Sequence, residues 1–143
     1  LALDLPPEEA DEYAGLMREA KLCSIWLVAP TTPEDRVKSI VRNGSGFIYY
    51  ISREGVTGMQ QKVANSIGDN ISVIRKHTDL PIAVGFGISN PDQARQVADC
   101  ADAVVVGSTI VNQIAEHGAD NNLAGHVADY VKMLVDAVKP PIS

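Results

Sequence analysis

The residues of this chain best suited to chemistry are three glycine-bearing turns, each of which directly follows a short apolar run. The turns lie at residues 55–58, 85–87 and 107–108, and the runs at 47–51, 82–84 and 103–106. Glycine lets the backbone approach a ligand closely and expose its N–H groups. Exposed N–H groups are suited to an anion, so these turns indicate phosphate binding.

The apolar runs that precede the turns are typical of buried parallel strands. Strands are expected to begin near residues 1, 24, 47, 82 and 103, with helical segments between them. This βα alternation predicts parallel strands joined by right-handed crossovers. The three turns would then lie at one end of the sheet, where the last loops of a (β/α)₈ barrel often hold a phosphate.

The connections give the remaining expected elements. Helices are predicted at about residues 6–21, 33–42, 69–77, 89–99, 108–116 and 122–138. Thr32 is the expected N-cap of the second helix. The polar connection 53–65, with its glycines, is predicted to be a lid-like loop.

Chain length limits the architecture. The chain has 143 residues, enough for one domain with a core, whereas a whole (β/α)₈ barrel takes about 250. Five βα units fit either part of such a barrel or an open doubly wound sheet. Because the chain opens in mid-strand, we expect residues 1–143 to form a single partial barrel domain whose N-terminal half is missing.

Composition excludes several classes of function. A net charge of −6 without a basic stripe argues against nucleic acid as a partner. No apolar run approaches the roughly 20 residues of a membrane span, and no signal-peptide pattern opens the chain. Cys23 and Cys100 are expected to be reduced core thiols of a cytoplasmic protein. His77, His117 and His126 lie in helix-like segments without ligand spacing, so no metal site is expected.

Four motifs resemble the tryptophan synthase alpha chain family. Residues 46–58 resemble its strand six and the loop that follows, 79–89 its strand seven, 104–111 its strand eight and 4–9 the end of its strand four. The resemblance covers essentially the whole chain in the right order. It implies an α/β fold that is the C-terminal part, strands 4–8, of a TIM (β/α)₈ barrel.

The family's activity follows from the same resemblance. Alpha chains are lyases of tryptophan biosynthesis that cleave indole-3-glycerol phosphate to indole and glyceraldehyde 3-phosphate. They pass the indole to a beta chain in an α₂β₂ assembly. The resemblance implies no cofactor for the alpha chain, because pyridoxal phosphate belongs to the partner beta chain.

The resemblance also assigns roles to single residues. It places the phosphate on the backbone N–H groups of glycines and on one serine, and it places aromatic side chains on the indole side of the pocket and a threonine in the lid. The implied substrate-binding residues are Gly58, Gly87, Gly107 and Ser108 for phosphate, Tyr49 and Phe86 for indole, and Thr57 for the lid.

The chain departs from the family in one respect. The two catalytic carboxylates of the family lie in its N-terminal half, and no carboxylate here matches them, so no catalytic residue is assigned in this chain. Asp4 is expected at the contact with the beta chain.

Two alternative functions stay open: a non-catalytic phosphate-binding module that modulates a partner enzyme, and a sister phosphate-binding barrel of the same pathway. Tyr49 as core filler and Ser108 as a simple N-cap are the plainer alternatives.

Overall fold

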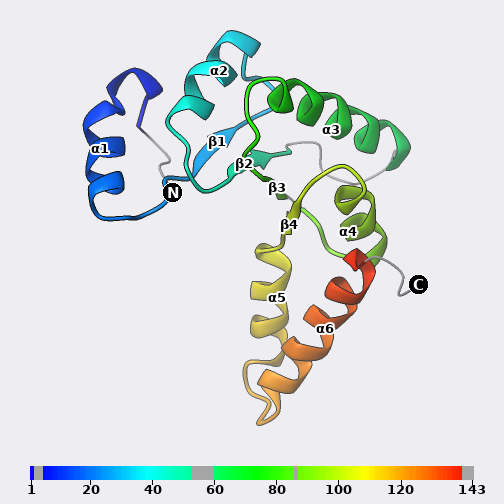
Figure 1. Cartoon of the computed structure of the whole chain (residues 1–143). Helices are drawn as coiled ribbons and strands as arrows, with labels where there is room; N and C mark the ends of the chain where they lie inside the picture. Colours follow the sequence, from blue (N-terminus) through cyan, green and yellow to red (C-terminus); the bar gives the residue numbers. More distant parts are fainter. Residues whose placement is uncertain (2–4, 53–59, 86, 140–143) are drawn as a thin grey trace.

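The structure is a computed structural model that describes residues 1, 5–52, 60–85 and 87–139, with only the backbone described for 60–65. Its strands are β1 (Trp26–Val28), β2 (Ile48–Ile51), β3 (Ile82–Gly85) and β4 (Ala103–Val105). Its helices are η1 (Pro7–Glu9), α1 (Asp11–Glu19), α2 (Glu34–Arg42), α3 (Gln60–Arg75), α4 (Pro91–Ala98), α5 (Ser108–His117) and α6 (Leu123–Val138). Figure 1 shows these elements along the chain.

The four strands form one parallel sheet in the order β1-β2-β3-β4. Trp26 lies opposite Ile48, Ile48 opposite Ile82, and Ala83 opposite Ala103. A helix connects each strand to the next, so the predicted βα alternation is confirmed for these four strands. The predicted first strand covers residues 1–4, of which residues 2–4 lie outside the described residues.

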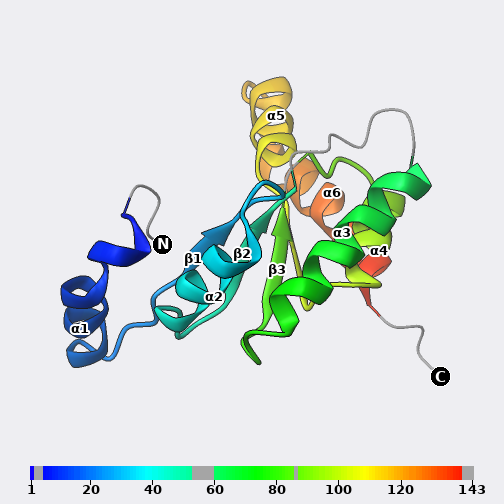
Figure 2. The same cartoon turned by 90° about the horizontal axis from the view of Figure 1, so that it is seen from above.

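One face of the sheet carries the core. Alternate strand residues on this face, such as Trp26, Ile48 and Tyr50, are almost fully buried. Helices α2, α3 and α4 follow one another along the sheet (Figure 2). Their apolar stripes complete a single cluster with the strands, which includes Val37, Ile40, Ile67, Ile71, Ile74, Ala94, Val97 and, from α6, Leu134. Burial of these apolar side chains holds the strands together and therefore sets the relative positions of their ends.

The opposite face of the sheet is less covered. Leu27, Tyr49 and Ile51 alternate with the core residues and are only half-buried. In a closed barrel, the residues that alternate with the outward-facing ones point into the interior. The chain therefore has a helix-covered outer face and an inner face that carries Tyr49.

Two expected boundaries are wrong. Thr32 does not cap α2: its Oγ1 accepts a hydrogen bond from the Ala29 N–H at 3.0 Å, and Pro33 is the N-cap residue. Helix α3 begins at Gln60 rather than near Asp69, so the last six residues of the expected loop 53–65 are helical. Ile67, Ile71 and Ile74 keep the spacing of one helix face.

The expected N-terminal helix is also divided. The turn η1 ends at Glu9, and α1 begins at Asp11 and ends at Glu19. Tyr13 of α1 packs edge-on against Trp26 of β1, with ring centroids 6.3 Å apart. Trp26 is almost fully buried, since 2% of the residue is exposed. No helix within the described part of the chain is long and apolar enough to cross a membrane.

Asp102 links three elements at the amino end of the sheet. Its Oδ2 accepts hydrogen bonds from the Ile82 N–H and from the Arg75 guanidinium, each at 2.8 Å. These interactions hold the pKa of the carboxyl group below its ordinary value of 3.8, and the bond from Ile82 is the larger cause. The ionised carboxylate therefore stabilises the start of β3.

Asp102→Ala is expected to lower the free energy of unfolding by about 1 kcal/mol at neutral pH, because the site is partly exposed. The folded pKa lies below the unfolded one, so this contribution is present above about pH 4 and is lost as pH falls through the folded pKa. Urea unfolding at several pH values measures it. Asp79→Asn, in the exposed connection between α3 and β3, is the control, and a variant–wild-type difference that grows in acid would contradict the prediction.

Candidate functional site

Helix α5 starts directly where β4 ends. Ser108 is its first residue, and the N-cap Gly107 has φ −124° and ψ −80° and provides no side-chain cap. The Ile110 and Val111 N–H groups bond back to the Gly107 carbonyl at 2.9 and 3.2 Å. The first N–H groups of a helix lack intrahelical acceptors and lie at the positive end of its dipole. This end of α5 is therefore suited to an anion.

The loop after β3 is attached to that helix end. Gly87, in this loop, has a positive φ of 66°, a conformation that favours glycine. The Thr109 hydroxyl of α5 donates to the Ile88 carbonyl at 2.9 Å, and the Tyr130 hydroxyl of α6 donates to the Ser89 carbonyl at 3.0 Å. Both helices therefore hold the loop beside the start of α5.

The space in front of these two turns is open. Among the described residues, a Cβ atom added at Gly87 or at Gly107 would meet no heavy atom within 4 Å apart from those of its chain neighbours, and both residues are exposed. Strands β3 and β4 are hydrogen-bonded neighbours, so the two turns belong to adjacent strand ends. The arrangement can accept a small anion on backbone N–H groups without a charged side chain.

Tyr49 lies close to the same end of the sheet. A Cβ atom added at Gly85 would lie 2.5 Å from the Tyr49 hydroxyl oxygen and 2.9 Å from Val105 Cβ. The absence of a side chain at Gly85 therefore makes room for the Tyr49 ring on the inner face. Its hydroxyl lies next to the last residue of β3, which leads into the turn that contains Gly87.

The structure thus brings together four of the seven predicted binding residues. Gly87, Gly107 and Ser108 lie at adjacent strand ends, and Tyr49 lies on the inner face beside them. The remaining predicted residues, Thr57, Gly58 and Phe86, lie outside the described residues, as does the predicted interface residue Asp4.

The cysteines differ in part from the expectation. Both are free thiols, but Cys23 is exposed and so is no core residue. Cys100 is half-buried, and its thiol contacts the Val97 carbonyl at 3.3 Å. Burial, with a smaller effect of Asp99, raises the pKa of the Cys100 thiol. Its protonated state is therefore favoured.

One cluster was missed from the sequence. His117, Asp120 and His126 have ligand-type atoms that all lie within 4.8 Å of one another. The sequence spacing of the histidines gives no sign of this cluster, because two of them come together only where the ends of two helices meet. The only signal in the sequence was that a tight turn between the helices at 108–116 and 122–138 would bring their ends close.

The fold and the site indicate a class of protein: an α/β barrel built of parallel βα units, with open glycine turns at the carboxyl ends of its strands. Within this class, residues 1–139 match the model of one family, described as "Tryptophan synthase alpha chain". The chain belongs to the tryptophan synthase alpha chain family.

Similar proteins agree with this assignment. The tryptophan synthase alpha chain of Opitutus terrae is 49% identical over 140 residues, which are 97% of this chain and 53% of the relative. That of Phenylobacterium zucineum is 44% identical over 97% of this chain and 50% of the relative. The chain therefore spans about half the length of the curated relatives it matches.

Solved structures show the same proportion. The tryptophan synthase subunit alpha of Legionella pneumophila is 31% identical, with a TM-score of 0.79, over 95% of this chain and 50% of that one. A structure of the tryptophan synthase a2b2 complex of Pyrococcus furiosus matches with 30% identity and a TM-score of 0.79 over 93% of this chain and 53% of that one. The barrel fold expected from the resemblance is confirmed.

Proposed function

We propose that the protein carrying this chain is a tryptophan synthase alpha subunit that cleaves indole-3-glycerol phosphate to indole and glyceraldehyde 3-phosphate. The observation that carries the proposal is the open start of α5 beside the Gly87 turn, in a chain of this family. A phosphorylated three-carbon unit needs such an anion site. The chain would supply the phosphate-binding part of the pocket.

In this proposal the phosphate is held by backbone N–H groups at Gly58, Gly87 and Gly107 and by Ser108. The hydrogen bond from the Thr109 hydroxyl to the Ile88 carbonyl holds the Gly87 turn and the Gly107 turn in a fixed position relative to each other. Because the N–H groups of the Gly87 and Gly107 turns are fixed before the ligand arrives, little reorganisation of these turns is needed on binding. Specificity for phosphate then comes from shape and from the dipole of α5.

The aromatic residues would hold the other end of the substrate. Tyr49 would bound the indole side of the pocket together with Phe86, while Thr57 would act in the lid. The place of Tyr49 on the inner face beside Gly85 supports its part of this role. Its half-buried position leaves ring surface for a ligand.

Cleavage of the carbon–carbon bond needs one group that protonates the indole ring and another that removes the proton of the glycerol hydroxyl. No carboxylate of this chain matches the family's pair, so the acid and the base would come from elsewhere in the protein. We further propose an α₂β₂ assembly with a beta chain, no cofactor in the alpha subunit and a cytoplasmic location.

The test uses the complete gene product that carries this chain, incubated with indole-3-glycerol phosphate. We expect release of indole, measured by chromatography, and an increase in its rate when a tryptophan synthase beta chain is added. The 143-residue chain alone is the control and is expected to release none. A folded complete product that consumes no substrate with or without the beta chain would contradict the proposal.

A second candidate is a non-catalytic phosphate-binding module that modulates a partner enzyme, since the open start of α5 would serve such a module equally well. A complete product that binds glycerol 3-phosphate, releases no indole and changes the activity of the beta chain would support this candidate instead.

A further inference from the structure

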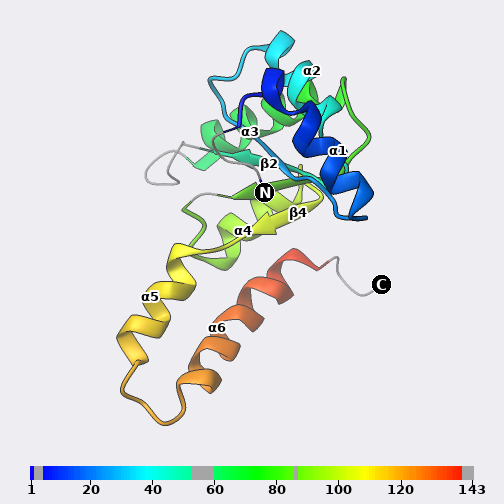
Figure 3. The ribbon, with the colours of Figure 1, turned by 90° about the vertical axis from the view of Figure 1, so that its left-hand side faces the viewer.

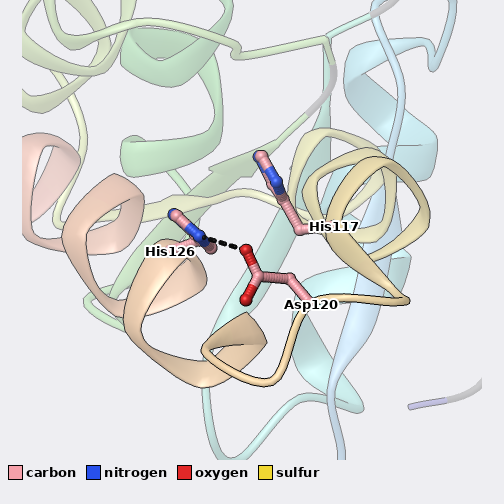
Figure 4. Close-up of side chains that lie close together, drawn as sticks. All are labelled: His117, Asp120 and His126. Carbon is pink, nitrogen blue, oxygen red and sulfur yellow. Dashed lines mark hydrogen bonds and ion pairs between the residues drawn. The ribbon is translucent and has the colours of Figure 1, made fainter.

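Three side chains of the kind that bind metal ions meet where α5 turns into α6. His117 is the last residue of α5, Asp120 lies in the turn, and His126 lies in the first turn of α6. The two imidazole rings are stacked, with centroids 4.5 Å apart and planes 20° from parallel. Figure 4 shows both rings and the carboxylate gathered on one side of the turn. The two helices run side by side away from the sheet (Figure 3), so the cluster is remote from the Gly87 and Gly107 turns.

The backbone of this turn is well fixed. The Asp120 N–H donates to the His117 carbonyl at 2.8 Å, and the Leu123 N–H donates to the Asp120 carbonyl at 3.1 Å. One carboxylate oxygen of Asp120, Oδ1, accepts the Asn122 N–H at 2.7 Å. The other, Oδ2, contacts His126 Nε2 at 2.9 Å. The main chain thus orients the carboxylate and keeps Oδ2 directed at the histidine.

The charges around the cluster suit a cation. The Asp120 carboxylate brings a negative charge to the cluster, and its two oxygens face the Asn122 N–H and His126 Nε2. His117 lies at the C-terminal, negative end of the α5 dipole. Lys132 lines the same open cavity of about 450 Å³, but its ammonium pairs with Asp136 at 2.7 Å.

One distance is close to that in a metal centre, and the three donor atoms lie within 4.8 Å of one another. Zinc binds imidazole nitrogen and carboxylate oxygen at about 2.0–2.2 Å, so ligand atoms around a tetrahedral ion lie about 3.3 Å apart. The contact between Asp120 and His126 is already near this value. His117 and His126 are only half-buried, so their rings can turn toward a common ion without repacking the core.

We propose that His117, Asp120 and His126 form a binding site for one divalent transition-metal ion, best suited to zinc. Two imidazoles and a carboxylate match the ligands of zinc, whereas magnesium and calcium take mainly oxygen. The ion would clamp the end of α5 to the start of α6, and water would fill its fourth position. This site is independent of the proposed lyase activity, because it shares no residue with the phosphate turns.

The test is calorimetric titration of the complete gene product with zinc chloride, with cobalt(II) absorption as a probe of tetrahedral geometry. We expect one zinc per chain at this site. His117→Ala and His126→Ala should each weaken zinc binding by at least about 10- to 100-fold. Loss of an outer-shell partner already costs this much, and each histidine would be a direct ligand. Asp120→Asn keeps an oxygen for the Asn122 N–H, so it should weaken zinc binding while leaving the turn folded.

A matched control uses the other histidine–carboxylate pair. His77 Nε2 lies 3.0 Å from Glu34 Oε1, but this pair is not part of any cluster of three ligand groups in the described residues. His77→Ala should therefore leave zinc affinity unchanged. The proposal is overturned if the folded protein takes up no zinc, or if His117→Ala, Asp120→Asn and His126→Ala all bind it as the wild type does. Either result would leave the cluster as a hydrogen-bonded clasp between two helices.

Discussion

Gly107→Asp is expected to weaken binding of glycerol 3-phosphate by at least about 100-fold, or about 3 kcal/mol. The new carboxylate would extend into the open space before α5, where a Cβ atom has no neighbour within 4 Å in the described part of the chain beyond the adjacent residues. There it would repel the phosphate and would accept hydrogen bonds from the N–H groups at the start of α5 that would otherwise bind the phosphate. Aspartate is also a favourable N-cap residue, and φ at this position is negative, so the fold should keep its stability. Loss of binding would then be separate from loss of structure.

Isothermal titration of the complete gene product, with a thermal melt of each sample, measures this effect. Gly107→Asn has nearly the same volume without the charge and should lose less affinity than Gly107→Asp. Gly15→Asp adds the same charge in α1, also into open space, and should bind as the wild type does. If Gly107→Asp binds the ligand normally, the phosphate site lies elsewhere and the proposed role of α5 is wrong.

The strands could be predicted because their signal is local. The runs before Gly85 and Gly107 are apolar and short, and each ends at a glycine turn, so burial and chain direction follow from the pattern alone. The positions of Gly87, Gly107 and Ser108 at one end of the sheet then follow from parallel pairing. The sequence therefore predicts the candidate anion site at this end of the sheet.

Helix boundaries were less predictable, because competing interactions decide them. Thr32 has the side chain of an N-cap, yet its hydroxyl accepts the Ala29 N–H and closes the turn before α2. The residues from Gln60 onward looked like a polar loop, yet the backbone there is already helical in continuity with the buried Ile67 and Ile71. Tertiary packing outweighed composition in this segment.

Contacts between distant elements could not be predicted at all. His117 and His126 are nine positions apart, a separation that fits no ligand motif within one helix, and only the reversal between α5 and α6 stacks their rings. The fit of Tyr49 against Gly85 likewise depends on the register of β2 with β3, which pairs Tyr49 with Ala83 and Ile51 with Gly85. Register is a property of the whole sheet rather than of either strand alone.

That fit gives the last prediction. Gly85→Ala is expected to lower the free energy of unfolding by about 1–3 kcal/mol, as overpacking of a well-packed site does. The added Cβ atom would lie 2.5 Å from the Tyr49 hydroxyl oxygen, 3.1 Å from Tyr49 Cζ and 2.9 Å from Val105 Cβ. Either the Tyr49 ring or the end of β4 must move. Gly68→Ala is the control, since its Cβ atom would meet nothing within 4 Å and alanine favours a helix.

A double-mutant cycle with Tyr49→Phe identifies the cause. Removing the hydroxyl group takes away the closest of the three contacts, so Gly85→Ala should cost less in the Tyr49→Phe background, by about 1 kcal/mol in urea unfolding. The contact with Val105 remains, so the rescue should be partial. If the two substitutions are additive, the strain lies on β4 instead, and the Tyr49 ring does not depend on Gly85 for its place beside the strand end.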